Sequence, residues 1–201
     1  MPNENRENNI VDFGEPDKGN SIIKVIGVGG GGGNAVNHMY REGIHDVSFV
    51  LCNTDNQALN DSPVPIHLQL GKEGLGAGNR PAKARQAAEE SIEDVRRMLN
   101  DGTKMAFITA GMGGGTGTGA APVVAKIAKD MGILTVGVVT KPFRFEAKTR
   151  MNNALTGIEN LKKAVDTLIV IPNDKLLEIV DRRTTMPEAL RKADEVLQQA
   201  V

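Results

Sequence analysis

The chain has 201 residues, 40% of them hydrophobic, which is enough for one domain with a substantial core. Aromatic residues make up only 3%, and the formal net charge is −1 at pH 7. This composition disfavours nucleic acid as a partner, because single strands are bound by aromatic stacking and by basic fields. No apolar run reaches the length of a membrane span, so we expect no direct membrane insertion. The single cysteine, Cys52, excludes an internal disulfide and fits a cytoplasmic protein.

The order of polar and apolar segments predicts an α/β fold. Residues 1–20 are polar and without periodicity, which predicts a disordered tail. Val- and Ile-rich runs then alternate with helical patterns, as in a three-layer, Rossmann-like domain whose mostly parallel sheet carries helices on both faces. Strands are expected at residues 22–28, 47–52, 66–70, 105–109, 134–139 and 168–171. Helices are expected at residues 35–41, 82–99, 120–131, 147–164, 176–180 and 187–201.

The last expected helix has no termination signal. It begins with Pro187 in its first turn, and its apolar stripe continues through Leu197 to Val201 without a glycine cap. We therefore expect the chain to stop inside a helix, at or near a domain boundary. A natural C-terminal helix that frays is the alternative.

A first glycine-rich run, residues 27–34, follows the first expected strand. Glycine accepts positive φ and lets an anion approach backbone N–H groups closely, and a helix N-terminus adds partial positive charge. The run therefore forms a candidate phosphate cradle, made of Gly30, Gly31, Gly32, Gly33 and Asn34. It also fits a dinucleotide fingerprint, in which Asp55 after the second strand would meet a ribose hydroxyl.

A second glycine-rich run follows the fourth expected strand. It contains Gly111, Gly113, Gly114, Gly115, Thr116, Gly117 and Thr118. Two cradles at neighbouring strand ends suit a triphosphate, and the threonines add hydroxyl donors. Neither run ends in the Gly-Lys-Ser/Thr of a Walker loop, so backbone amides, helix dipoles and a cation, expected to be Mg²⁺, would balance the charge.

The second run resembles the signature of the tubulin-like GTPases, in the wording Gly-Gly-Gly-Thr-Gly-Thr-Gly at residues 113–119. Residues 24–29, 53–55, 74–78, 142–146 and 169–174 resemble, in the same order, the FtsZ group of this family, which polymerises into the bacterial division ring. The resemblance extends from about residue 21 to the end. It implies a GTP-binding domain at residues 21–186 and the start of a central helix at residues 187–201.

The resemblance also implies how guanine is read. An Asn after a late strand and an Asp on the central helix map onto Asn173 and Asp194. A carboxylate suits guanine because it accepts from N1–H and the 2-amino group. Without the family, Asn173 would be an ordinary helix cap and Asp194 a solvated helix residue. Leu190 stands where a phenylalanine often packs on the base, so an apolar wall is kept without aromatic stacking.

Other polar residues receive roles only from the resemblance. Glu146 and Arg150 would contact the ribose and a nearby phosphate, although their spacing at the start of a helix also predicts a plain i,i+4 ion pair. Asn53 and Asp55 would lie near the phosphates and metal, although both suit an ordinary turn. The loop containing Gly76, Ala77 and Gly78 would sense the γ-phosphate. No direct protein ligand to the metal is expected.

In the family, hydrolysis is completed between subunits by an acidic loop beyond the central helix. We therefore expect this chain to bind GTP or GDP with Mg²⁺, to contain no complete catalytic set and to hydrolyse GTP poorly alone. The full-length protein would form a head-to-tail homopolymer at the midcell division site and bind other division proteins.

Three alternatives remain open from the sequence. The first glycine run and Asp55 also permit an NAD-dependent oxidoreductase, although such enzymes need only one glycine-rich loop. A self-association module that uses nucleotide without catalysis is the second. Tubulin itself, or an archaeal or plasmid relative, is the rival within the family, although the wording at residues 142–146 and 169–174 favours FtsZ. Cys52 is expected to be packed in a strand rather than to act as a nucleophile.

Overall fold

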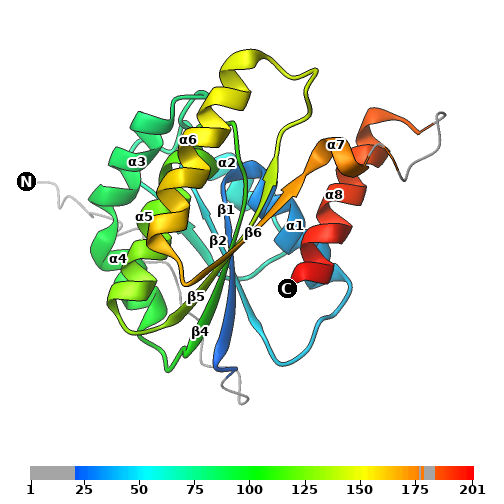
Figure 1. Ribbon diagram of the computed structural model, residues 1–201. Coiled ribbons are helices and arrows are strands. Elements are labelled where there is room, and N and C mark those ends of the chain that lie inside the picture. The colour runs from blue at the N-terminus through cyan, green and yellow to red at the C-terminus, as the bar shows by residue number, and fades with distance from the viewer. Residues whose placement is uncertain (1–20, 177, 179–183) are drawn as a thin grey trace, which may run out of the picture.

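A computed structural model describes residues 21–176, 178 and 184–201, and its centre is a six-stranded sheet (Figure 1). The strands are β1 (Ile23–Val28), β2 (Ser48–Asn53), β3 (His67–Gln69), β4 (Met105–Gly111), β5 (Leu134–Lys141) and β6 (Thr167–Pro172). Their order is β3-β2-β1-β4-β5-β6, and every pairing is parallel. The predicted Rossmann-like fold is confirmed, and its sheet is fully rather than mostly parallel.

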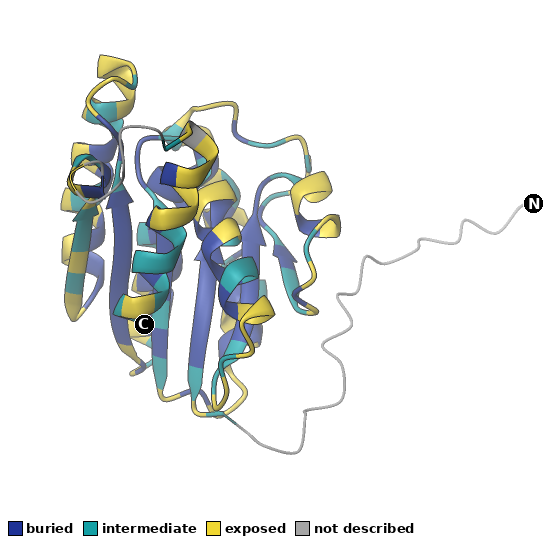
Figure 2. Cartoon of the chain, turned by 90° about the vertical axis from the view of Figure 1, so that its right-hand side faces the viewer, coloured by how far each residue is buried: buried dark blue, intermediate teal, exposed yellow. Residues whose placement is uncertain are grey.

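The sheet is covered on both faces, as the continuous apolar runs predict. Alternate residues of a strand point to opposite faces, so Val25 of β1 joins one apolar cluster and Ile26 joins the other. One face packs against α3 (Pro81–Glu90), α4 (Ile92–Leu99), α5 (Thr116–Asp130) and α6 (Lys148–Ala164). The other face packs against α1 (Gly29–Arg41), α2 (Asn56–Asn60) and α8 (Met186–Ala200). Figure 2 shows the buried strands between these partly exposed helical layers.

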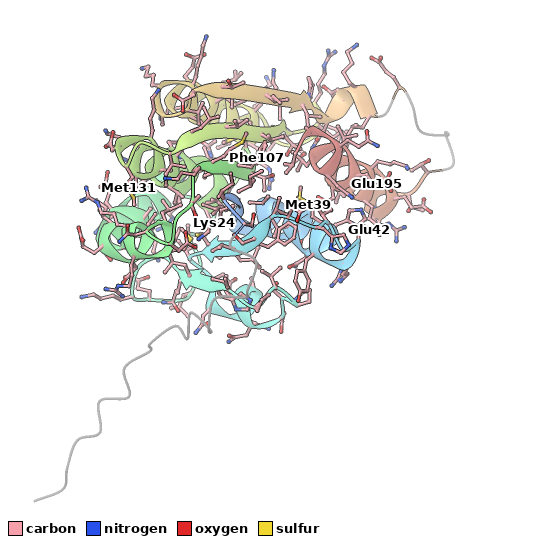
Figure 3. The ribbon with its side chains drawn as sticks, turned by 90° about the horizontal axis from the view of Figure 1, so that it is seen from below. Lys24, Met39, Glu42, Phe107, Met131 and Glu195 are labelled. Carbon is pink, nitrogen blue, oxygen red and sulfur yellow. The ribbon has the colours of Figure 1, made fainter. Side chains whose placement is uncertain are left out.

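Helix α8 closes the second face. Its Ala189, Ala193 and Leu197 are buried. Leu197 shares a cluster with Met39 of α1, which Figure 3 labels beside α8, and with Val136 and Val138 of β5. In the part of the chain that the structure describes, no helix is both long and apolar enough to cross a membrane.

Several predicted boundaries are wrong. The first glycine run is not a loop, because α1 starts at Gly29 and the glycines form its first turns. The helix expected at residues 82–99 is two helices, separated by a break at Ser91. Helix α2 was not expected. The short helix α7 (Asn173–Leu176) begins three residues before the one predicted at 176–180, most of which lies outside the described residues.

The strand order places a switch point between β1 and β4. From β1 the chain crosses through α1 to β2, and from β4 it crosses through α5 to β5 in the other direction. Helices α1 and α5 therefore leave neighbouring strands toward opposite faces and open a crevice at the carboxyl edge of the sheet. Ligands of open parallel sheets bind at such a point, and both glycine-rich runs lie there.

Candidate nucleotide-binding site

The two glycine-rich runs are in direct backbone contact. A Cβ placed on Gly29 would lie 2.7 Å from the amide nitrogen of Gly117, and one on Gly31 would lie 3.0 Å from the Cα of Gly111. Contacts this short leave no space for a side chain at either position. The sequence predicted two neighbouring cradles, and the fold joins them into one continuous backbone surface.

Other glycines are required by packing below this surface. A Cβ on Gly32 would lie 2.2 Å from the carbonyl oxygen of Thr109 on β4, and one on Gly27 would lie 2.5 Å from the carbonyl oxygen of Gly32. Helix α1 therefore starts directly against β1 and β4. Gly32 has an architectural reason to be glycine that does not involve a ligand.

Two glycines of the runs have open space where a side chain would lie. A Cβ on Gly30 or on Gly114 would meet nothing within 4 Å, and neither residue has a positive φ. Gly30 lies in the first turn of α1, and Gly114 lies in the turn that leads into α5. Both backbones face open space at the crevice, where the lack of a side chain leaves room for a close approach by another molecule.

Both helix N-termini are suited to an anion. Neither α1 nor α5 has a capping side chain, and neither has an acidic residue in its first turn. The first N–H groups of a helix have no partner within the helix, and the helix dipole makes this end positive. Because α1 and α5 start at adjacent strands, the switch point has two such helix ends, and neither is capped by a side chain of the described residues.

The second run is held in shape by its own threonines. The Thr118 hydroxyl is buried and accepts a 2.8 Å hydrogen bond from the Gly113 N–H. The Thr116 hydroxyl lies 2.7 Å from that of Thr54 in the loop after β2. Both predicted hydroxyl donors therefore have partners within the chain, and the residues from Thr116 onward form the first turn of α5 rather than a loop.

The loop after β2 joins the same edge. Asn53 is buried, and its Oδ1 accepts from the Asp55 N–H. Asp55 caps α2 by accepting from the Ala58 N–H at 3.2 Å, as the turn-chemistry interpretation predicted. Residue 55 also pairs with Leu75 in an isolated antiparallel bridge, which holds the loop containing Gly76, Ala77 and Gly78 beside it.

That loop approaches the second cradle at Gly115. A Cβ on Gly115 would lie 3.0 Å from both the Ala77 Cβ and the amide nitrogen of Arg80. The Arg80 N–H donates to the Ala77 carbonyl at 3.1 Å across Gly78 and Asn79, and both of these central residues have positive φ. This is the pattern of a type I′ turn. The predicted γ-phosphate loop thus lies against the start of α5.

Glu146 and Arg150 form the ion pair that their spacing predicts. Arg150 Nε lies 2.8 Å from Glu146 Oε2, and Glu146 Oε1 accepts from the Phe143 N–H at 3.0 Å. Glu146 precedes α6, which starts at Lys148, one residue after the predicted start of this helix. The backbone of Arg150 reaches the second cradle, since a Cβ on Gly113 would lie 3.0 Å from its carbonyl oxygen.

Asn173 and Asp194 lie on adjacent elements, α7 and α8 (Figure 1). Asn173 is buried, and its Oδ1 has no hydrogen-bond partner among the described residues. Burial raises the pKa of Asp194 to about 6, and the nearby His38 opposes this increase. Neither residue is the ordinary cap or solvated side chain that sequence alone suggests. Leu190, the expected apolar wall, is 48% exposed.

The remaining reactive side chains do not form a site. Cys52 is buried in β2, and burial raises its thiol pKa to about 12, so the expected packing role fits. Within residues 21–176, 178 and 184–201, no cluster of His, Cys, Asp or Glu could hold a metal ion by itself.

The fold is a parallel α/β domain with two uncapped helix N-termini at its switch point. The family model of the Tubulin/FtsZ family, GTPase domain, matches residues 22–181, so the chain belongs to this family. The NAD-dependent oxidoreductase alternative is therefore not supported, and Asp55 acts as a helix cap in the fold.

Solved structures show the same relationship. An FtsZ dimer from M. jannaschii is 48% identical, with a TM-score of 0.84, over 89% of this chain and 52% of that one. CetZ1 from Haloferax volcanii, a GDP-bound monomer, is 25% identical, with a TM-score of 0.77, over 88% and 58%. CetZ2 from the same organism, a GTPγS-bound protofilament, shares the fold at 24% identity and a TM-score of 0.78, over 88% and 56%. The chain spans about half the length of these proteins.

Sequence reasoning missed two features of this edge. Thr54 was quoted only as part of a motif, although its hydroxyl joins β2 to α5. Arg80 was not singled out at all, although its backbone lies against Gly115. The sequence Gly-Asn-Arg-Pro at residues 78–81 could have predicted this turn, because Gly and Asn favour turns and Pro favours the first position of a helix.

Proposed function

We propose that this chain binds GTP or GDP with Mg²⁺, with the phosphates seated on the joined glycine cradles. The observation that carries the proposal is the open space at Gly30 and Gly114, two cradle glycines at which a Cβ would meet no atom within 4 Å. Phosphate oxygens at this position would accept from the backbone N–H groups that begin α1 and α5. The cradle comprises Gly30, Gly31, Gly32, Gly33 and Asn34, with Gly111, Gly113, Gly114, Gly115, Thr116, Gly117 and Thr118.

We propose that Asn173 and Asp194 recognise the guanine base through hydrogen bonds. Asn173 has a buried Oδ1 without a partner among the described residues, and such an atom usually has one in a native structure. Guanine offers N–H donors for both an amide oxygen and a carboxylate. Binding a donor would also favour the ionised form of Asp194, whose burial otherwise disfavours it. Leu190 is exposed and free to cover the base.

Further residues at this edge are proposed to contact the ribose and to lie near the metal. Glu146 can accept from a ribose hydroxyl while Arg150 holds its second oxygen. Mg²⁺ would be held through phosphate oxygens and water, with Asn53 and Asp55 near it, and with Gly76, Ala77 and Gly78 lining the terminal phosphate. A cation is needed there because the cradle itself supplies only partial charges.

The acids of this edge already have partners, which supports slow hydrolysis by the isolated chain. Asp55 caps α2, Glu146 pairs with Arg150, and Asp174 pairs with Arg144 at 3.1 Å. None of these three carboxylates is left to activate a water molecule. We therefore propose that an adjacent subunit supplies that group during head-to-tail self-association. The dimer and protofilament forms of the FtsZ and CetZ2 neighbours support this mode.

A cell-division role follows from the likeness to FtsZ, with the cytoplasmic face of the division site as the place of assembly and other division proteins as partners. A self-association module that uses nucleotide without catalysis is the second candidate, and it rests on the same engaged carboxylates. Phosphate release by the chain alone, and after addition of a partner that carries the acidic loop but no nucleotide site, separates the two. A rate that rises when the partner is added supports the GTPase, and no release with or without the partner supports the module.

The binding test is direct. The purified chain is titrated in separate experiments with GTP, GDP, ATP and NAD, each with Mg²⁺, by calorimetry. Nucleotide released on denaturation is then identified by chromatography. We expect both guanine nucleotides to bind and ATP and NAD not to bind. Equal binding of ATP and GTP would contradict the guanine assignment, and binding of NAD alone would overturn the proposal.

A further inference from the structure

The terminal phosphate of a bound triphosphate adds negative charge that the backbone cradle does not fully offset. Neither glycine-rich run contains a Lys or Arg, and helix N-termini supply only about half a charge each. Mg²⁺ would offset part of this charge, and a basic side chain from a neighbouring segment could offset more and favour a triphosphate over a diphosphate.

Three basic side chains on the segments that flank the second cradle are already paired, whereas Lys72, Arg80, Lys141 and Lys148 have no ion pair among the described residues. Arg150 pairs with Glu146 at 2.8 Å, Arg144 with Asp174 at 3.1 Å and Lys83 with Glu73 at 2.6 Å. Arg80 is exposed, and its side chain has no hydrogen bond or ion pair with the described residues. Among these basic residues, Arg80 is also the one whose backbone touches the start of α5.

Arg80 is held in place by its neighbours. Its amide nitrogen lies 3.0 Å from the position of a Cβ on Gly115, the N-cap of α5. The type I′ turn over Gly78 and Asn79 fixes it from one side. Pro81 fixes it from the other, because a residue before proline is confined to extended backbone, and Arg80 has φ −111° and ψ 98°.

The helix behind Arg80 is equally constrained. A Cβ on Gly119 would lie 2.0 Å from the Pro81 carbonyl oxygen, so α3 and α5 are in backbone contact directly below the cradle. Beside the cradle, Gly114 faces open space. The Arg80 side chain thus starts from a rigid point next to the open end of the second cradle, which is the place for the last phosphate.

We propose that Arg80 is the residue that distinguishes GTP from GDP, by placing its guanidinium on the γ-phosphate. This rests on the proposed function. Arginine suits the task because its planar group donates two parallel hydrogen bonds to phosphate oxygens and remains charged at all physiological pH values. Asp55 and Glu73, two acids on the neighbouring segments, both have partners in the chain.

The test compares GTP with GDP affinity in the wild-type chain and in Arg80→Ala and Arg80→Lys, by calorimetry with Mg²⁺. Loss of a charge-assisted pair should weaken GTP binding of Arg80→Ala about tenfold or more and leave GDP within about twofold. Arg80→Lys should fall between, because it keeps the charge and loses the two-bond geometry. Thermal melting without nucleotide should be unchanged, since Arg80 is exposed.

Two control variants separate a specific contact from general charge. Arg85→Ala removes a cation of the same helix that pairs with Glu89, and Lys72→Ala removes one from the same loop. Both should keep the wild-type ratio of GTP to GDP affinity. An unchanged ratio in Arg80→Ala, an equal loss for both nucleotides, or the same effect in Lys72→Ala would overturn the assignment of Arg80. If the wild-type chain binds neither nucleotide, the proposed function itself fails.

Discussion

The hydroxyl oxygens of Thr54 and Thr116 lie 2.7 Å apart and join the loop after β2 to the first residue of α5. Sixty-two positions separate them in sequence. Thr54 is buried, and its carbonyl oxygen accepts from the Gly76 N–H at 2.9 Å. One residue therefore connects the second cradle to the loop that carries Arg80.

Replacement of Thr116 by Ala should destabilise the chain by about 1 kcal/mol, because it removes one partner of a partly buried hydrogen bond. Thr116→Ser keeps the hydroxyl and should stay close to wild type. Urea unfolding of Thr54→Ala, Thr116→Ala and the double variant gives the coupling free energy. We expect roughly 0.5–1.5 kcal/mol, and additive single effects would show that the two hydroxyls do not interact.

The glycine contacts predict opposite outcomes for two neighbouring alanine variants. Gly30→Ala meets no atom within 4 Å, so the fold should be kept or stabilised by up to about 1 kcal/mol, as alanine favours helix. Its new methyl group would still block a phosphate, so guanine-nucleotide affinity should fall at least about tenfold. Calorimetry and thermal melting on the same sample measure both effects.

Gly32→Ala is the matched control. Its Cβ would lie 2.2 Å from the Thr109 carbonyl oxygen, a backbone atom that cannot move away alone. We expect destabilisation of about 2 kcal/mol or more before any ligand is added. If Gly30→Ala binds nucleotide as wild type does, the phosphates are seated elsewhere.

Much of this architecture was predictable from local pattern. Consecutive apolar residues such as Val25 and Ile26 indicate a strand buried on both faces, and a parallel sheet then places every strand end at one edge. Both glycine runs and the Asn53–Asp55 turn were expected there for that reason. The Glu146–Arg150 pair followed from i,i+4 spacing alone.

The features that were not predicted from the sequence depend on contacts between distant segments. Glycine has poor helix propensity, so residues 29–33 look like a loop, yet packing of α1 against β1 and β4 makes them helical. The unpartnered Oδ1 of Asn173 and the raised pKa of Asp194 come from burial, which spacing does not reveal. Arg80 gains its position from a turn and a backbone contact with Gly115.

Lys24, labelled in Figure 3, lies at the opposite end of the sheet from the crevice, and its ion pair is expected to stabilise the fold. Its side chain is 2% exposed, donates to the Met98 carbonyl at 2.7 Å and forms an ion pair with Asp101. Asp101→Asn would leave a buried ammonium without its counter-ion. We expect a loss of roughly 2 kcal/mol, below the 3–5 kcal/mol typical of fully buried pairs, because Asp101 is 53% exposed.

A control variant removes the positive charge of Lys24 together with the negative charge of Asp101. Lys24→Met combined with Asp101→Asn should recover stability to within about 1 kcal/mol of wild type, because an apolar side chain of similar length suits the site. Burial opposes ionisation of Asp101, but hydrogen bonds from Lys24 and Thr103 outweigh it and lower its pKa. Its contribution should therefore be complete above its ordinary pKa near 3.8 and disappear as pH falls through the lower folded value. Wild-type stability in Asp101→Asn would mean that the Met98 carbonyl alone suffices.

Titration of Asp194 should give opposite pH trends in folding stability and in nucleotide affinity. Its folded pKa of about 6 exceeds the ordinary 3.8 because burial disfavours the charged form, so the folded chain holds more protons between these values. The free energy of unfolding should therefore decrease as pH rises from about 4 to about 6 and be independent of this group above that range. Guanine binding needs the ionised carboxylate, so GDP affinity should instead increase over the same interval.

Two variants isolate this residue. Asp194→Asn should be more stable than wild type at pH 7, lack this pH dependence and bind GDP weakly at every pH. His38→Gln removes the positive charge that favours ionisation, so both transitions should move to higher pH. Chemical unfolding and GDP titration from about pH 3.5 to about 7.5 cover the window set by these pKa values. If GDP affinity is independent of pH across it, or is the same in Asp194→Asn, then Asp194 does not contact the base and its raised pKa reflects burial under α1 alone.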